Sequence, residues 1–120
     1  MKVAVTAQGQ ELSSQMDLRF GRAKWIHIVD TETSEHQVHD NAVRLNLPQG
    51  AGIQTGQKVA NLGVEAVITG NVGPNAFRAL NAANVRIFLA GQQTVEQAVT
   101  AFKKGQLQEV DQANVEGHWV

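Results

Sequence analysis

The fold of this chain is decided by residues 62–77, which read LGVEAVITGNVGPNAF. The apolar run from Val64 to Thr69 lies between two glycines, as is typical of a buried parallel strand. Gly63 follows a helical stretch, at the position where a left-handed residue commonly ends a helix. Pro74 fits the first turn of a second helix, where its missing N–H costs nothing. The stretch therefore predicts a helix, a buried strand and another helix in succession.

The sequence on either side supplies the other elements. Upstream, the patterns predict strands at Lys2–Thr6 and Trp25–Val29 and a weaker strand at Glu35–Asp40, the last two forming a hairpin. A loop over Asn41–Gln49 leads into a helix over Gly50–Leu62. Downstream, the helix that begins at Pro74 ends near Asn84, a strand covers Val85–Leu89, and Thr94 with Gln97 forms the capping box of a last helix.

This order, β-β-β-α-β-α-β-α, defines the fold class. Its alternating half requires parallel strands joined by right-handed crossovers, and its first half is a hairpin. We therefore expect an α/β three-layer sandwich around a mixed five-stranded sheet. One domain would span residues 1–107, and residues 108–120 would form a polar C-terminal tail.

Composition excludes several classes of function. The chain has 120 residues, with ten basic and eleven acidic side chains, and this balance argues against a broad nucleic-acid surface. No apolar run approaches the roughly 20 residues that span a bilayer, and the first residues lack a signal-peptide pattern, so we expect a cytoplasmic protein with no membrane contact. The chain has no cysteine. Disulfides, thiolate nucleophiles and cysteine-held metal centres are therefore excluded.

Three segments should meet beyond the carboxyl ends of the parallel strands, where ligands bind in such sheets. They are the end of the long loop over Ala7–Lys24, the helix start at Gly50–Ile53, and the strand-to-helix turn at Thr69–Asn75. The first segment carries three cations, and arginine suits large or oxygen-rich anions. The other two offer backbone N–H groups at helix N-termini, which attract anions.

A plainer interpretation of each segment stays open. Arg19, Arg22 and Lys24 could form a solvated loop that pairs with Asp17 or Asp30. The glycines could serve only as turn residues, because the sequence has no P-loop and its glycine spacing lacks the context of a dinucleotide fingerprint.

Catalytic and metal-ligating sets are not evident. His27 lies in the middle of a strand and is expected to pack in the sheet, whereas His36 and His39 are three apart and should face opposite sides. His118 lies in the tail. The serines lack the context of a nucleophile elbow. We therefore predict no catalytic residue and no protein-held metal ion.

Four blocks of the sequence together carry a family resemblance. Phe20–Ala23, Gly50–Gln54, Leu62–Phe77 and Thr94–Val99 resemble the dinitrogenase iron–molybdenum cofactor biosynthesis family, and the likeness runs from Met1 to about Leu107. The resemblance implies a ribonuclease H-like fold and non-enzymatic binding of metal clusters. Family members include nitrogenase cofactor carriers and a small protein of sulfate reducers that holds a molybdenum–copper sulfide cluster.

One departure from the family pattern bears on the ligand. Members often have histidine before the Phe-Gly-Arg motif, but this chain has Arg19, and a guanidinium stays protonated and does not ligate metals. The resemblance then implies that charge and backbone N–H groups hold a preassembled anionic molybdenum-containing sulfide cluster. The Mo-Cu-S type is favoured and the iron–molybdenum cofactor type is the alternative. The implied cofactor-binding residues are Arg19, Phe20, Gly21, Arg22, Gly50, Gly52, Ile53, Asn71, Gly73, Pro74 and Asn75.

Two other functions remain as alternatives. One is a cofactor-free interaction module that works with redox, cofactor-assembly or cell-division proteins. The other is an enzyme acting on a phosphate or nucleotide ligand, although the sequence offers neither a P-loop nor a carboxylate cluster for it.

Overall fold

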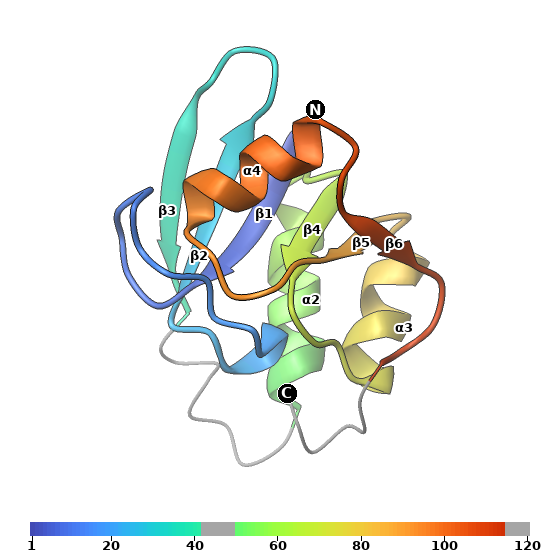
Figure 1. Ribbon diagram of the computed structural model, residues 1–120. Helices are drawn as coiled ribbons and strands as arrows, with labels where there is room; N and C mark the ends of the chain where they lie inside the picture. The colour runs from blue at the N-terminus through green and yellow to red at the C-terminus, as the bar shows by residue number, and fades with distance from the viewer. Residues whose placement is uncertain (42–49, 115–120) are drawn as a thin grey trace.

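The computed structural model describes residues 1–41 and 50–114. Its helices and strands follow the order β1 (Lys2–Ala7), the 3-10 turn η1 (Phe20–Arg22), β2 (Trp25–Asp30), β3 (His36–Asp40), α2 (Ala51–Asn61), β4 (Ala66–Thr69), α3 (Pro74–Ala82), β5 (Arg86–Leu89), α4 (Val95–Lys103) and β6 (Gln108–Val110). Figure 1 shows the strands as one twisted sheet with helices on both of its faces. The predicted loop over Asn41–Gln49 lies outside the described residues except for Asn41, and so does His118.

The sheet has the strand order β3-β2-β1-β4-β5-β6. The central pairs β1–β4 and β4–β5 are parallel, as the alternating half of the sequence predicts. The outer pairs β1–β2, β2–β3 and β5–β6 are antiparallel, so the sheet is mixed. Because β1 and β4 are neighbours and parallel, their carboxyl ends lie at the same edge of the sheet.

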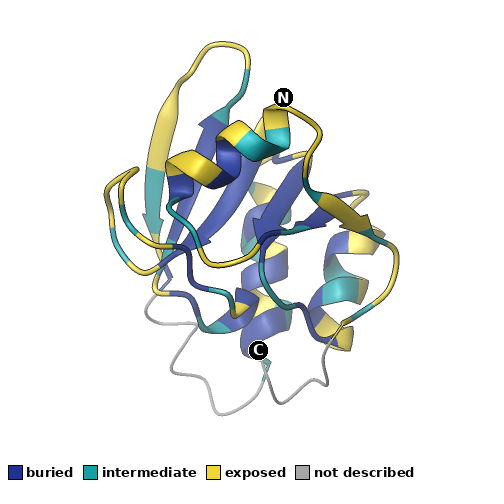
Figure 2. Ribbon diagram, in the orientation of Figure 1, coloured by how far each residue is buried: buried dark blue, intermediate teal, exposed yellow. Residues whose placement is uncertain are grey.

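Two hydrophobic cores cover the two faces of the sheet. On one face α4 packs through Val95, Ala98 and Val99 onto one set of strand residues. On the other face α2 and α3 pack through residues such as Val59 and Leu80. Figure 2 shows the buried colour on the central strands and on the inward faces of the helices, whereas β3 is largely exposed at its edge. The three-layer α/β arrangement is therefore confirmed.

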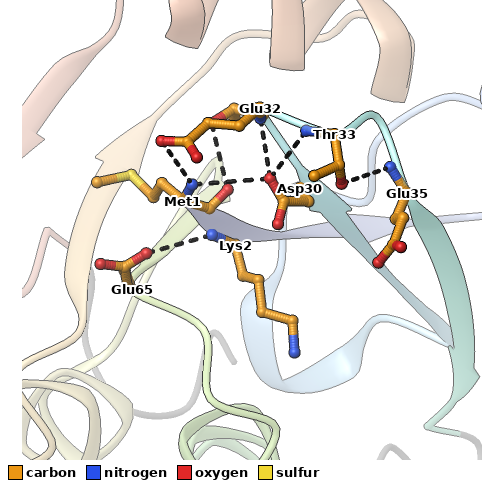
Figure 3. A network of polar contacts seen from close by, with 8 residues as sticks. Met1, Lys2, Asp30, Glu32, Thr33, Glu35 and Glu65 are labelled. Atoms are coloured by element: carbon orange, nitrogen blue, oxygen red, sulfur yellow. Dashed lines mark hydrogen bonds and ion pairs between the residues drawn. The ribbon is translucent and has the colours of Figure 1, made fainter.

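The predicted hairpin of β2 and β3 is confirmed, and its turn explains where the chain reverses. Asp30 accepts backbone hydrogen bonds from Glu32 and Thr33 at 2.8 and 3.2 Å. These bonds lower the pKa of the half-buried Asp30 carboxyl. The N-terminal amine lies 3.7 Å from the same carboxylate, and Figure 3 shows this network closing around Met1. The polar stretch therefore ends β2 by offering the backbone local partners.

The expectation of five strands is wrong, because β6 adds a sixth at the outer edge. This strand is three residues long, and its burial pattern is mostly exposed, so it has no apolar alternation that a sequence could reveal. Backbone pairing with β5 creates it, with Phe88 opposite Glu109. Part of the segment predicted as a polar tail is thus joined to the sheet. The ribonuclease H-like assignment stays a prediction.

The remaining boundaries agree closely with the sequence patterns. The capping box of α4 is present, with Thr94 accepting from the Gln97 backbone N–H and the Gln97 side chain accepting from the Thr94 backbone N–H. Gly63 is left-handed, at φ 77°, just after α2. Among the described residues, no helix is long and apolar enough to cross a membrane.

Candidate functional site

The carboxyl ends of β1 and β4 are joined by a buried pair of hydroxyl groups. The Thr6 hydroxyl donates to the backbone oxygen of Asp17 at 2.6 Å and lies 2.8 Å from the Thr69 hydroxyl. Since the single proton of Thr6 goes to Asp17, the Thr69 hydroxyl donates to Thr6. This chain of bonds fixes the long loop to the sheet immediately before Arg19.

The arginine segment and the turn after β4 lie side by side. The Phe20 backbone N–H donates to the Asn71 backbone oxygen at 3.3 Å, and the Asn71 side-chain amide donates to the Leu18 backbone oxygen at 3.2 Å. A Cβ on Gly70 would lie 2.5 Å from the Leu18 Cβ, so only glycine allows this approach. Two of the three predicted segments are therefore in direct contact.

The two helices that begin at this edge have no side-chain caps. Gly50 and Gly73 precede α2 and α3, neither helix has a capping hydrogen bond from a side chain, and neither has an acidic residue in its first turn. In contrast, α4 has a capping box and Glu96 in its first turn. A helix N-terminus without such neighbours keeps its partial positive charge for another anion.

Gly52 brings α2 and α3 together near their first turns. A Cβ at this position would lie 3.1 Å from the Ala76 Cβ, and one turn later Gly56 makes the same kind of approach to Ala79. The small residues therefore serve helix packing, a role that the sequence analysis did not assign to Gly52. The close contact places the two uncapped helix starts beside each other.

The cations of the arginine segment have partners of their own. Asp17 accepts the Arg19 backbone N–H at 3.0 Å, and its carboxylate lies 3.6 Å from the Arg19 Nε. The Arg19 side chain is 57% exposed, so this ion pair is open to solvent and weak. Lys24 lies over the Trp25 ring at 5.5 Å. The alternative pairing with Asp17 is thus correct for Arg19, and this pairing leaves more than half of the Arg19 side chain exposed.

Asn41, which follows β3, bonds to the arginine segment and to α2. Its buried side-chain amide donates to the Ala23 backbone oxygen and to the Thr55 hydroxyl, both at 3.0 Å. It thereby links the end of β3 to the segment after η1 and to α2. The sequence analysis did not single out Asn41.

The structure gathers the predicted residues at one edge of the sheet, but it gives them different degrees of access. Phe20, Gly21, Gly52 and Gly73 are buried; Arg22, Gly50, Ile53 and Asn71 are half-buried; and Arg19, Pro74 and Asn75 are exposed. The Phe20 side chain has no exposed surface and belongs to the core. The Asn75 side chain accepts a hydrogen bond from Arg78 of the next turn.

A second residue that the sequence analysis did not single out is Asn114. Its side chain contacts the backbone of Gly70 and Val72 and the side chain of Asn71, although it lies more than 40 positions later in the sequence. Nothing in the local pattern of the polar C-terminal segment signals this contact.

A histidine pair lies on the face of the sheet that α4 covers, where His27 is paired with Val5 of that core. His27 Nε2 lies 2.7 Å from the Gly9 carbonyl oxygen and therefore carries the proton, so Nδ1 accepts from His36 Nε2 at 2.7 Å. Ring centroids 4.9 Å apart, with ring planes within 17°, place these two nitrogens in line, edge to edge. Metal–nitrogen bonds of about 2.0 Å each would need a longer separation. The pair shares a proton, and His27 is the sheet-packed residue that the sequence predicts.

His36 and His39 face opposite sides of the sheet as expected, because His39 pairs with Ile26 of the core beneath α2. No group of three or more histidine, aspartate or glutamate side chains in residues 1–41 and 50–114 is arranged to hold a metal ion.

Fold and site define a small three-layer α/β domain in which two uncapped helix starts and the segment that carries Arg19 gather at one edge of the sheet. The chain belongs to the dinitrogenase iron-molybdenum cofactor family, whose model matches residues 1–105. Membership supports a role as a cofactor-binding or carrier protein.

The chain is also similar to individual proteins along almost its whole length. The apo form of the orange protein from Desulfovibrio gigas is 39% identical, with a TM-score of 0.92 over 95% of this chain and 96% of that chain. A NifB-like protein from Thermotoga is 37% identical, with a TM-score of 0.85 over 97% and 98% of the two chains. A protein from Methanocaldococcus jannaschii is 27% identical over 92% of both chains.

Proposed function

We propose that this protein binds and carries or stores an anionic molybdenum-containing metal–sulfide cluster without catalysing a reaction. The observation that carries the proposal is the meeting of two uncapped helix N-termini with the exposed guanidinium of Arg19 at one edge of the sheet. Positive ends of helix dipoles and a weakly hydrated cation favour a large, polarisable anion.

The composition supports a ligand that arrives already assembled. The chain has no cysteine, so it cannot supply thiolates to build a metal–sulfur centre. A cluster coated by its own sulfides needs only charge and N–H donors from the protein. Among such clusters we favour the molybdenum–copper sulfide type that the family resemblance implies, and the iron–molybdenum cofactor is the alternative. Cofactor-assembly, redox or cell-division proteins are the partners that such a carrier would serve.

Reconstitution tests the proposal directly. Tetrathiomolybdate and copper added to the apoprotein should give a stable visible charge-transfer spectrum that stays with the protein through gel filtration. The double variant Arg19→Ala with Arg22→Ala should lose most of that absorbance. The matched control is Lys103→Ala with Lys104→Ala, which removes the same charge from exposed positions at the end of α4.

Three results would contradict the proposal. One is the absence of any protein-dependent spectrum, which would favour a cofactor-free interaction module. Another is an equal loss in the arginine and lysine pairs, since that would show only an effect of net charge. Thermal stabilisation by nucleotides but not by thiomolybdate would point instead to a phosphate-ligand enzyme.

A further inference from the structure

The chain returns to the candidate site after β6. Figure 1 shows the segment that follows this edge strand running past the first turn of α3. There the Asn114 backbone N–H donates to the Val72 backbone oxygen at 3.1 Å, and the Val72 N–H donates to the Asn114 Oδ1 at 2.7 Å. The two residues are thus bonded reciprocally, through backbone on one side and side chain on the other.

The rest of the Asn114 amide is also engaged. Its Nδ2 lies 3.2 Å from the Asn71 Oδ1 and 3.4 Å from the Gly70 backbone oxygen. One side chain therefore contacts three consecutive residues of the turn between β4 and α3. An amide that both donates and accepts in this way fixes the orientation of the peptide units that it contacts.

This turn connects two parts of the site. Its far end continues into Pro74 at the uncapped start of α3, and Asn71 also bonds to Leu18 and Phe20 of the arginine segment. Asn114 holds Asn71 from one side while the arginine segment holds it from the other. The C-terminal segment thus acts on both the helix start and the segment that carries Arg19.

We propose that Asn114 is a positioning residue of the anion site, which makes residues 111–114 part of that site. The proposal rests on the proposed function for the identity of the ligand. It lies beyond the family match, which ends at residue 105. The side chain acts by holding the turn of residues 70–72 in the conformation that presents the start of α3.

One variant and a matched control test the role. Asn114→Ala removes the side-chain contacts. Gln112→Ala changes an exposed residue two positions earlier. With tetrathiomolybdate and copper as the probe, Asn114→Ala should bind about tenfold more weakly, as expected for the net loss of one or two hydrogen bonds. Gln112→Ala should bind as the wild-type chain does.

Two further measurements separate positioning from general stability. In apo Asn114→Ala, the Val72 amide should exchange its hydrogen about tenfold faster, because its acceptor is gone, while amides of the central strands keep their protection. At saturating probe, the charge-transfer band of this variant should be shifted, because the cluster then meets a displaced turn. A variant that was merely less stable would give the wild-type band.

The outcomes distinguish the two proposals. If the wild-type chain binds the probe and Asn114→Ala binds it equally well with the same band, the positioning role is wrong and the proposed function stands. Tighter binding by Asn114→Ala would show that the segment competes with the ligand, which also overturns the proposal. If the wild-type chain does not bind the probe, the proposed function fails. Unchanged hydrogen exchange at the Val72 amide in Asn114→Ala would overturn the positioning role as well.

Discussion

Gly52 of α2 and Ala76 of α3 touch, since a Cβ at Gly52 would lie 3.1 Å from the Ala76 Cβ. We expect Gly52→Val to lower the free energy of unfolding by about 1–3 kcal/mol, because the added methyl groups force the two helices apart. Urea denaturation measures the effect. Gly91→Val is the control, since no atom lies within 4 Å of a Cβ there. Equal losses in the two variants would contradict the packing role.

The Thr6 hydroxyl bridges Asp17 and Thr69. Removal of the Thr6 hydroxyl should therefore lower the free energy of unfolding more than removal of the Thr69 hydroxyl. Thr6→Val leaves the Thr69 hydroxyl without its acceptor and the Asp17 oxygen without this donor, so we expect a loss of about 1–3 kcal/mol. Thr69→Val removes one bond and should cost about 1 kcal/mol. Denaturant unfolding of both variants checks the order, and a larger loss for Thr69→Val would show that the proton assignment is reversed.

Burial lowers the pKa of His27, and this makes the stability depend on pH. In the unfolded chain, His27 binds a proton once the pH falls below the ordinary histidine pKa of about 6.5, whereas in the folded chain burial opposes protonation. The free energy of unfolding should therefore be constant above about pH 7.5 and fall as the pH drops through about 6.5 towards 5. Urea midpoints at a series of pH values measure this slope.

Two variants show which histidine causes the pH dependence of the free energy of unfolding. Burial also lowers the pKa of His39, but His39 is only partly buried, whereas His27 is fully buried. His39→Gln should therefore keep most of the slope. His27→Gln should flatten it. A profile that keeps its full slope in His27→Gln would show that another group is responsible.

The edge strand β6 is held by a two-pronged ion pair between Arg86 and Glu109, with contacts of 3.0 and 2.7 Å. The hydrogen bonds raise the pKa of Arg86 and lower the pKa of Glu109, yet both side chains are exposed, so global stability should change little. We expect Glu109→Gln to speed amide exchange in β6, and high salt to do the same in the wild-type chain. Unchanged exchange would show that backbone pairing alone holds this strand.

Local physics made most of the fold predictable from the sequence. The apolar run before Gly70 marks a strand buried on both faces, and Thr94 with Gln97 marks a helix start, because each signal depends on residues a few positions apart. In contrast, β6 exists only because β5 offers it an edge, so its polar residues carry no signal. The same limit explains why five strands were expected.

The candidate site also has a part that the sequence predicts and a part that it does not. The sequence by itself determined that arginines and glycine-led helix starts would gather at one edge of the sheet, because alternating strands and helices fix where parallel strands end. Only the tertiary structure decided that Gly52 serves packing, that Arg19 pairs with Asp17 and that Asn114 holds the turn at Val72. These contacts join residues far apart in the chain or depend on how two helices meet, and no local spacing encodes such a meeting.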